Sequence, residues 1–174
     1  MVTMAKRLRS VTKRIYLALY KAYHGIPSGV RILGPVNIDA SDVTFGSHVT
    51  IWQGTHIWGT GKIVIGDNVA IGNDVVIYSD ASIHIGNDTS IAGQAYIIDS
   101  DHGSKRESLM RLQPLVSQPI IIGCDVWIGA GAKILRGSNV GDGAIVGAQA
   151  LVKGDIDPYS VYVGVPAKKV GSRV

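Results

Sequence analysis

The stretch from Pro119 to Val152 decides the fold, and it reads PIIIGCDVWIGAGAKILRGSNVGDGAIVGAQALV. An aliphatic residue returns at every sixth position, and these residues are Ile122, Ile128, Ile134, Val140, Val146 and Val152. A period of six matches neither the alternation of a simple strand nor the turn of a helix. Such a hexapeptide repeat is typical of a parallel β-helix, in which three hexads make one triangular coil of about 18 residues.

Glycine follows the aliphatic residue in four of these hexads, at Gly123, Gly129, Gly141 and Gly147. We expect each aliphatic side chain to point inward and to stack on its equivalents in the coils above and below. The residue that follows lies at a tight corner, where a larger side chain would collide with the neighbouring coil.

Three consecutive blocks of equal length, 44–63, 64–83 and 84–103, carry a looser form of the pattern. The positions that align are Phe45, Ile65 and Ile85, then Ile51, Ile71 and Ile91, then Ile57, Ile77 and Ile97. Each block predicts one coil of three hexads with two extra positions at a corner. This register favours a repeat over the alternative, a β-sandwich with frequent glycines.

The chain therefore predicts an all-β fold with one β-helix domain over residues 30–174. The hexads break at residues 103–118, and an interruption of this length inside a solenoid is typical of a functional loop. Residues 153–174 form a short C-terminal segment, since Pro158 and Pro166 oppose further regular pairing.

Residues 1–29 form a separate basic segment. The spacing of the apolar residues predicts an amphipathic helix over 3–23, with Leu8, Val11, Ile15, Ala18, Leu19 and Ala22 on one face. We expect it to cap the open end of the β-helix. The alternatives are a helix on an anionic membrane surface and, less favoured by the motifs, nucleic-acid binding.

Charge and composition bound the partners and the compartment. Residues 1–30 hold six Lys or Arg and no acid, whereas the rest holds 11 basic and 13 acidic residues. The domain as a whole therefore implies no nucleic-acid partner. Cys124 is the single cysteine, so no internal disulfide forms. With no apolar run long enough to span a bilayer and no evident secretory signal, we expect a cytoplasmic protein, with the inner face of the membrane as an alternative.

The run Asp99-Ser100-Asp101-His102-Gly103 precedes the interruption. Histidine can accept and donate a proton near neutral pH, so His102 is a candidate general base. Alternation along a strand puts Asp99 and Asp101 opposite to it, so neither need be its partner. His84 lies one coil earlier in the repeat, and we expect it to stack beneath His102. The histidines are spread over different coils, so no metal site is expected.

Four segments together carry a family resemblance: DSDHG, the loop end QPIIIG, DVWIGAGAKIL, and DPYSVYVGVPAKKV. Over residues 44–171 the chain resembles the hexapeptide-repeat acetyltransferases, closest to the maltose, galactoside and polysaccharide O-acetyltransferases. The resemblance implies a left-handed parallel β-helix, acetyl-CoA as the donor, no metal, and a homotrimer with active sites between subunits.

The resemblance also assigns roles to residues. His102 matches the catalytic general base, and Trp127 matches a tryptophan that lines the reaction cleft and contacts donor and acceptor. The residues that match the CoA-binding positions are Gly129, Ala130, Gly147, Ala148, Pro166, Ala167 and Lys168. The chain departs from the family pattern at two places. Lys153 lies one position away from the family's lysine, and Val165 stands where the family often has an asparagine.

The candidates for contacts to the acceptor are Asn73, Asp74, Asp80 and Asp101, besides Trp127. A solvated corner is the structural alternative for the first three. We expect a saccharide or lipid-linked glycan as the acceptor, in capsule, O-antigen or exopolysaccharide biosynthesis. The alternatives are N-acetylation of a nucleotide-linked amino sugar and a non-catalytic scaffold.

Overall fold

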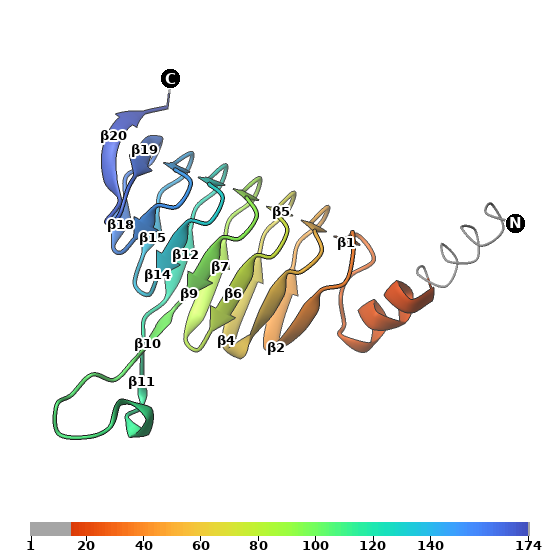
Figure 1. Ribbon diagram of the computed structural model, residues 1–174. Helices are drawn as coiled ribbons and strands as arrows, with labels where there is room; N and C mark the ends of the chain where they lie inside the picture. The colour runs from red at the N-terminus through yellow and green to blue at the C-terminus, as the bar shows by residue number, and fades with distance from the viewer. Residues whose placement is uncertain (1–14, 174) are drawn as a thin grey trace, which may run out of the picture.

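The computed structural model describes residues 15–173, and it shows stacked coils that form a three-sided prism (Figure 1). Face A carries β1 (Arg31–Ile32), β3 (Thr50–Ile51), β5 (Ala70–Ile71), β8 (Ser90–Ile91), β13 (Trp127–Ile128), β16 (Ile145–Val146) and β19 (Ser160–Val163), with β20 (Lys168–Ser172) antiparallel at its end.

Two long strands, β2 (Asn37–Phe45) and β4 (His56–Ile65), run from face B into face C. Face B continues with β6 (Val76–Ser79), β9 (Tyr96–Ile98), β14 (Lys133–Leu135) and β17 (Leu151–Val152). Face C continues with β7 (Ser82–Ile85), β12 (Ile120–Ile122), β15 (Asn139–Val140) and β18 (Asp155–Ile156). We call the corners of the prism edges AB, BC and CA.

The stacked columns predicted from the sequence form the core. Ile51 pairs with Ile71, which pairs with Ile91, and the other aligned columns pair in the same way. These isoleucines are almost completely buried. The prediction of a parallel β-helix of hexapeptide repeats with an extruded loop is confirmed. The expectation that Pro158 ends regular pairing was wrong, because Pro158 lies at a corner and the strands on either side of it, β18 and β19, still pair with β15 and β16.

Small residues are required at the corners, as expected. A Cβ atom on Gly86 would lie 2.6 Å from the carbonyl carbon of Gly123 in the next coil. This distance is far below van der Waals contact, and its partner is backbone that cannot rotate away. The hexad glycine therefore permits successive coils to stack at the spacing of hydrogen-bonded strands.

The described part of the N-terminal helix, residues 15–23, covers the first coil (Figure 1). The Tyr20 hydroxyl accepts a hydrogen bond of 2.8 Å from the Ile38 N–H, and the Lys21 Nζ donates to the Val30 carbonyl at 2.7 Å. The predicted apolar face is nevertheless exposed at Ile15 and Leu19, because Leu17 and Tyr20 pack against the core instead.

The helix predicted from the sequence begins at residue 3, so its first part, which includes Leu8 and Val11, lies outside the described residues. Across residues 15–173, no helix has both the length and the hydropathy needed to cross a membrane.

Candidate active site

A hairpin leaves the prism at edge BC and carries His102. Strands β10 (Ser100–His102) and β11 (Leu115–Ser117) pair antiparallel, with His102 opposite Leu115. The loop between them contains the short 3-10 helix η1 (Met110–Leu112) and extends away from the coils (Figure 1). Since regular coils continue on both sides of the hairpin, a rigid scaffold positions an exposed imidazole.

Two carboxylates fix the base of this hairpin. Asp99 is fully buried and accepts hydrogen bonds from the Ser79 hydroxyl at 2.8 Å and from the N–H groups of Asp80 and Ala81 at 2.7 and 3.0 Å. The Asp80 carboxylate accepts a bond of 2.5 Å from the Ser117 hydroxyl. The previous coil and the returning strand are thus joined at edge BC.

A third contact comes from the following coil. The Arg136 Nε donates to Asp101 at 2.5 Å, and its Nη1 donates to the Gln118 side chain at 2.7 Å. The carboxylates of Asp99 and Asp101 are therefore engaged by donors other than His102. The expectation for His84 was wrong: it lies on face C between Val64 and Ile121, because the hairpin shifts the register after residue 99.

A hollow of about 480 Å³ lies over face B beside His102. Its lining residues are Trp58, Tyr78, Tyr96, Ile98, Ser100, Asp101, His102 and Leu115. The rings of Trp58 and Tyr78 meet edge to face, with centroids 5.5 Å apart. Burial, together with the nearby Asp80, Asp99 and Tyr96, raises the pKa of the Tyr78 phenol, so it stays protonated at neutral pH.

Sequence reasoning missed this aromatic group. Trp58 and Tyr78 each follow the inward isoleucine of their coil, at equivalent positions of successive blocks, so the alignment of the blocks contained the signal. The sequence alone did not show that these outward side chains line a hollow, because it did not show that His102 and its hairpin lie beside face B.

The residues that match CoA-binding positions gather along edge AB near the C-terminal end. Gly129 stacks on Gly147, since a Cβ atom on Gly129 would lie 2.5 Å from the Ala148 nitrogen. The Ala130 carbonyl accepts a bond from the Gln149 N–H at 2.8 Å. The segment from Gly164 then lies against β17, where the Ala167 N–H donates to the Leu151 carbonyl at 2.8 Å.

Pro166 and Lys168 flank Ala167, and Lys168 begins β20. The neighbouring Lys169 pairs with Asp157 at 2.9 Å, and this contact lowers the pKa of the Asp157 carboxyl. Arg173 pairs with Asp125 at 2.6 Å and holds the end of β20 to edge CA. Lys168 therefore lies at the start of an exposed strand, which the ion pairs of Lys169 and Arg173 attach to the prism.

Trp127 points outward from face A and is 56% exposed. It lines a shallow hollow with Trp52, Asn73 and Gly93. Edge BC, where His102 leaves the prism, is the corner opposite face A. One copy of the chain therefore presents Trp127 and His102 on different sides.

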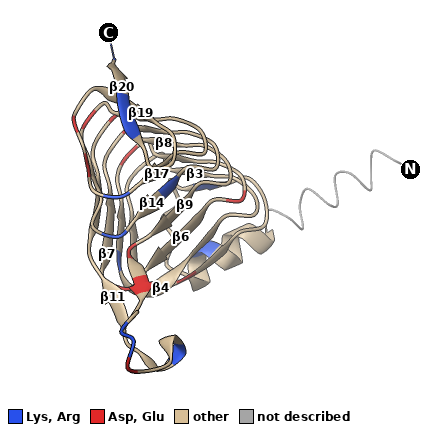
Figure 2. Cartoon of the chain, turned by 60° about the vertical axis from the view of Figure 1, so that its left-hand side comes forward, with Lys and Arg blue, Asp and Glu red and all other residues tan. Residues whose placement is uncertain are grey.

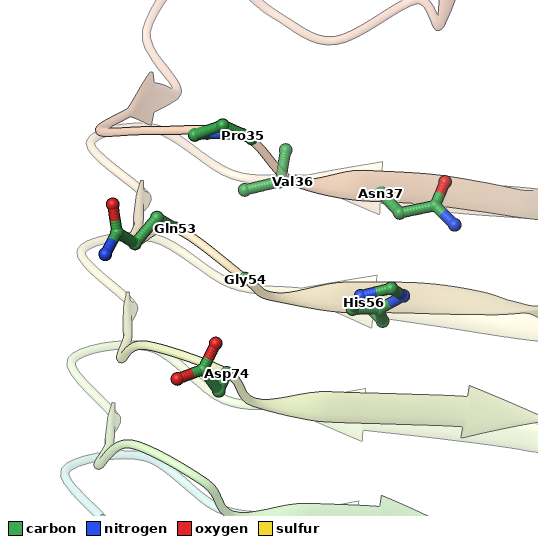
Figure 3. A pocket seen from close by; sticks show the side chains of 7 residues that line it. All are labelled: Pro35, Val36, Asn37, Gln53, Gly54, His56 and Asp74. Atoms are coloured by element: carbon green, nitrogen blue, oxygen red, sulfur yellow. The ribbon is translucent and has the colours of Figure 1, made fainter.

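The predicted acceptor residues separate. Asp80 and Asp101 lie at the base of the hairpin, while Asn73 lines the hollow beside Trp127. Asp74 lines another hollow at edge AB with Gln53 and His56, and Figure 3 shows Gln53 and His56 on one coil and Asp74 on the next. The structure thus brings two of the five predicted acceptor residues, Asp80 and Asp101, to the hairpin that carries His102 and leaves the other three elsewhere.

The loop between β10 and β11 carries positive charge away from the prism. Figure 2 shows basic residues on this loop, which contains Lys105, Arg106 and Arg111. Apolar side chains accompany them, since Leu109, Met110 and Leu112 are each more than 60% exposed. No group of His, Cys, Asp and Glu that could hold a metal ion occurs among the described residues.

Family models match two parts of the chain. Residues 119–154 match "Bacterial transferase hexapeptide (six repeats)", and residues 62–97 match "Hexapeptide repeat of succinyl-transferase". Both matches fall on coils of the prism, and the hairpin lies between them.

Two bacterial acetyltransferases are similar to this chain in sequence. WbbJ of Escherichia coli K12, named as a lipopolysaccharide biosynthesis O-acetyl transferase, is 37% identical over 136 residues, which are 72% of this chain and 69% of WbbJ. Rv3034c of Mycobacterium tuberculosis H37Rv, named as an acetyltransferase, is 40% identical over 65% of this chain and 38% of its own length. The chain thus spans little more than a third of the second relative.

Among solved structures, a single-residue mutant of AntD, an N-acyltransferase from Bacillus cereus, superposes with a TM-score of 0.69. It is 23% identical, and the superposition covers 84% of this chain and 86% of AntD. At this identity the likeness concerns the fold.

Proposed function

Because this chain belongs to the hexapeptide-repeat acetyltransferase family, we propose that it transfers an acetyl group from acetyl-CoA to a hydroxyl group of a saccharide. The observation that carries the proposal is the exposed His102, held on an anchored hairpin beside a hollow lined by aromatic and polar groups. The name of WbbJ supports oxygen as the acceptor atom.

His102 accepts the proton of the acceptor hydroxyl in this proposal. A sugar hydroxyl is a weak nucleophile, so a base within hydrogen-bond reach is needed when the C–O bond forms. Acetyl-CoA supplies the activated thioester. The imidazolium then returns its proton to the leaving sulfur, so that an acetylated saccharide and a free thiol result.

Edge AB fits the donor. Ala130 and Ala148 are exposed at this corner, and their small side chains let a pantetheine arm approach the backbone. Gly129 and Gly147 donate their own N–H groups to the Val146 and Tyr162 carbonyls and keep the coils close together. Lys168 lies on the exposed strand beyond them and can pair with phosphate groups. Binding of coenzyme A by AntD supports this assignment.

The assembly in this proposal is a homotrimer with sites between subunits. Since Trp127 faces away from His102 within one copy, a second copy would bring its own Trp127 and edge AB to the hairpin. The exposed Leu109, Met110 and Leu112 on the hairpin loop would contact that copy.

We also propose that residues 1–29 bring the protein to the inner face of the membrane. The exposed Ile15, Tyr16, Leu19 and Tyr23 and the five basic residues that precede them in the sequence suit an anionic lipid surface. Flotation with phosphatidylglycerol vesicles tests this. The proposal is supported if both added salt and a Leu19→Glu substitution weaken binding to these vesicles. Equal binding to neutral phosphatidylcholine vesicles contradicts it.

The central test is thiol release from acetyl-CoA with a panel of sugars. We expect His102→Ala to lower turnover at least about 100-fold, the usual contribution of a general base, while CoA binding stays within about twofold. His84→Ala is the matched control, because His84 is exposed on face C. Turnover by His102→Ala at the control level would exclude the proposed base.

A second candidate is N-acylation of a nucleotide-linked amino sugar, and the name of AntD favours it, since AntD is crystallised with dTDP-4-amino-4,6-dideoxyglucose and coenzyme A. An amine needs less activation than a hydroxyl. Its rate should follow deprotonation of the amine and should survive His102→Ala to a larger extent. Acetylation of an amino sugar but of no hydroxyl acceptor would select this candidate.

A further inference from the structure

An aromatic column extends the hollow beside His102 away from the hairpin along face B. Trp58 pairs with Tyr78, and Tyr78 pairs with Ile98 in the coil that leads to His102. Adjacent strands lie about 4.8 Å apart, so the column reaches about 10 Å from Ile98 to Trp58. Tyr96 lies diagonally next to Tyr78 and lines the same hollow.

The column projects from the prism and is not part of its core. The core side of these coils is filled by Ile57, Ile77 and Ile97, whereas Trp58, Tyr78 and Tyr96 are half-buried and point outward. Outward positions of a β-helix need no large aromatic side chains for packing. The stability of the prism therefore does not require the edge-to-face pair of Trp58 and Tyr78, and the two rings are available to a ligand.

The chemistry of this surface fits a sugar ring. An aromatic face carries negative partial charge and attracts the polarised C–H groups of a pyranose. Polar groups at the hairpin end, Ser100 and Asp101, and the protonated Tyr78 phenol can bind ring hydroxyls. A cavity of about 480 Å³ is within the range of sites for small ligands, which runs from about 300 to about 1,000 Å³.

We propose that Trp58, Tyr78 and Tyr96 bind the sugar ring next to the one that is acetylated, so that the acceptor is an oligosaccharide or glycan and not a monosaccharide. This inference rests on the proposed function. The ring that reacts lies beside His102, and the neighbouring ring stacks on the column farther along face B.

The experiment compares acceptors of increasing length. Initial rates of thiol release are measured with glucose, maltose and maltotriose, and with N-acetylglucosamine, chitobiose and chitotriose. We expect kcat/KM to rise from one ring to two in the series that is used. Trp58→Leu should lower kcat/KM for the disaccharide about tenfold and for the monosaccharide less than about twofold, the size of one aromatic contact.

Two variants control this result. Trp58→Phe keeps an aromatic face and should restore most of the preference, and Tyr159→Leu removes an exposed aromatic ring at edge CA, the corner opposite face B. An equal loss for one and two rings would overturn the inference. So would a change of molecular mass in Trp58→Leu, because the column would then be a contact between copies of the chain.

Calorimetric titration of the same sugars without acetyl-CoA separates this inference from the proposed reaction. Disaccharide binding that Trp58→Leu weakens, without any transfer, would support the sugar site and contradict the acetyltransferase activity. Transfer to a monosaccharide and a disaccharide with equal kcat/KM would support the reaction and contradict the second ring.

Discussion

Asp99 is the residue on which the position of the hairpin depends. Its carboxylate is fully buried and satisfies three donors on the previous coil, at the point where the chain leaves the prism. Asp99→Ala removes all three bonds and leaves the Ser79 hydroxyl buried without a partner. We expect a loss of about 3 kcal/mol in the free energy of unfolding, measured by urea denaturation.

Asp101→Ala is the matched control for this prediction. Its carboxylate is half exposed and pairs with Arg136 near the surface, so its loss should cost less than about 1 kcal/mol. If the two alanine variants unfold at the same urea concentration, the buried carboxylate does not anchor the hairpin.

Gly86 tests the second residue-scale claim, that coils approach too closely for a side chain. Gly86→Ala places a Cβ atom 2.6 Å from backbone atoms of Gly123, and we expect it to lower stability by about 1–3 kcal/mol. A Cβ atom on Gly171 meets nothing within 4 Å, so Gly171→Ala should be close to neutral. Thermal unfolding of both variants checks this, and an equally stable Gly86→Ala would contradict it.

At the scale of elements, Arg136 connects the hairpin to the following coil. Its contacts to Asp101 and Gln118 lie partly in solvent, so Arg136→Ala should change global stability by less than about 1 kcal/mol. Amide hydrogens of β10 and β11 should nevertheless exchange faster. Lys169→Ala breaks a comparable exposed pair in the C-terminal segment, and it should leave exchange in the hairpin unchanged.

The coils could be predicted from the sequence because the period of six repeats the same physical requirement at each turn. Ile51, Ile71 and Ile91 stack as the aligned blocks indicated. The exposed face of the N-terminal helix was not predicted, because helical spacing shows that an apolar stripe exists but not what it contacts. Ile15 and Leu19 belong to such a stripe and face outward.

The candidate site could be predicted only in part. His102 stood out because the repeat breaks beside it, but the partners of its hairpin lie far along the chain. Arg136 reaches back to Asp101, and Ser117 reaches back to Asp80, each across more than a full coil of sequence. A loop of irregular sequence carries no period from which such contacts could be derived.

At the scale of the whole molecule, the prism separates the residue proposed to contact the donor, Trp127, from the proposed general base, His102. Face A carries Trp127, and the opposite corner carries His102. A complete site would then need two copies of the chain, with the acceptor half from one and the donor half from the other.

Mixing two inactive variants tests this claim most directly. His102→Ala and Trp127→Ala are unfolded together, refolded as an equal mixture, and assayed for thiol release with an acceptor that the unmodified protein uses. We predict that each variant alone is strongly impaired. In randomly assembled trimers the mixture should regain about a quarter of full activity, because about a quarter of the sites then combine an intact His102 with an intact Trp127 from the neighbouring copy. A mixture no more active than its two components would contradict a site shared between copies.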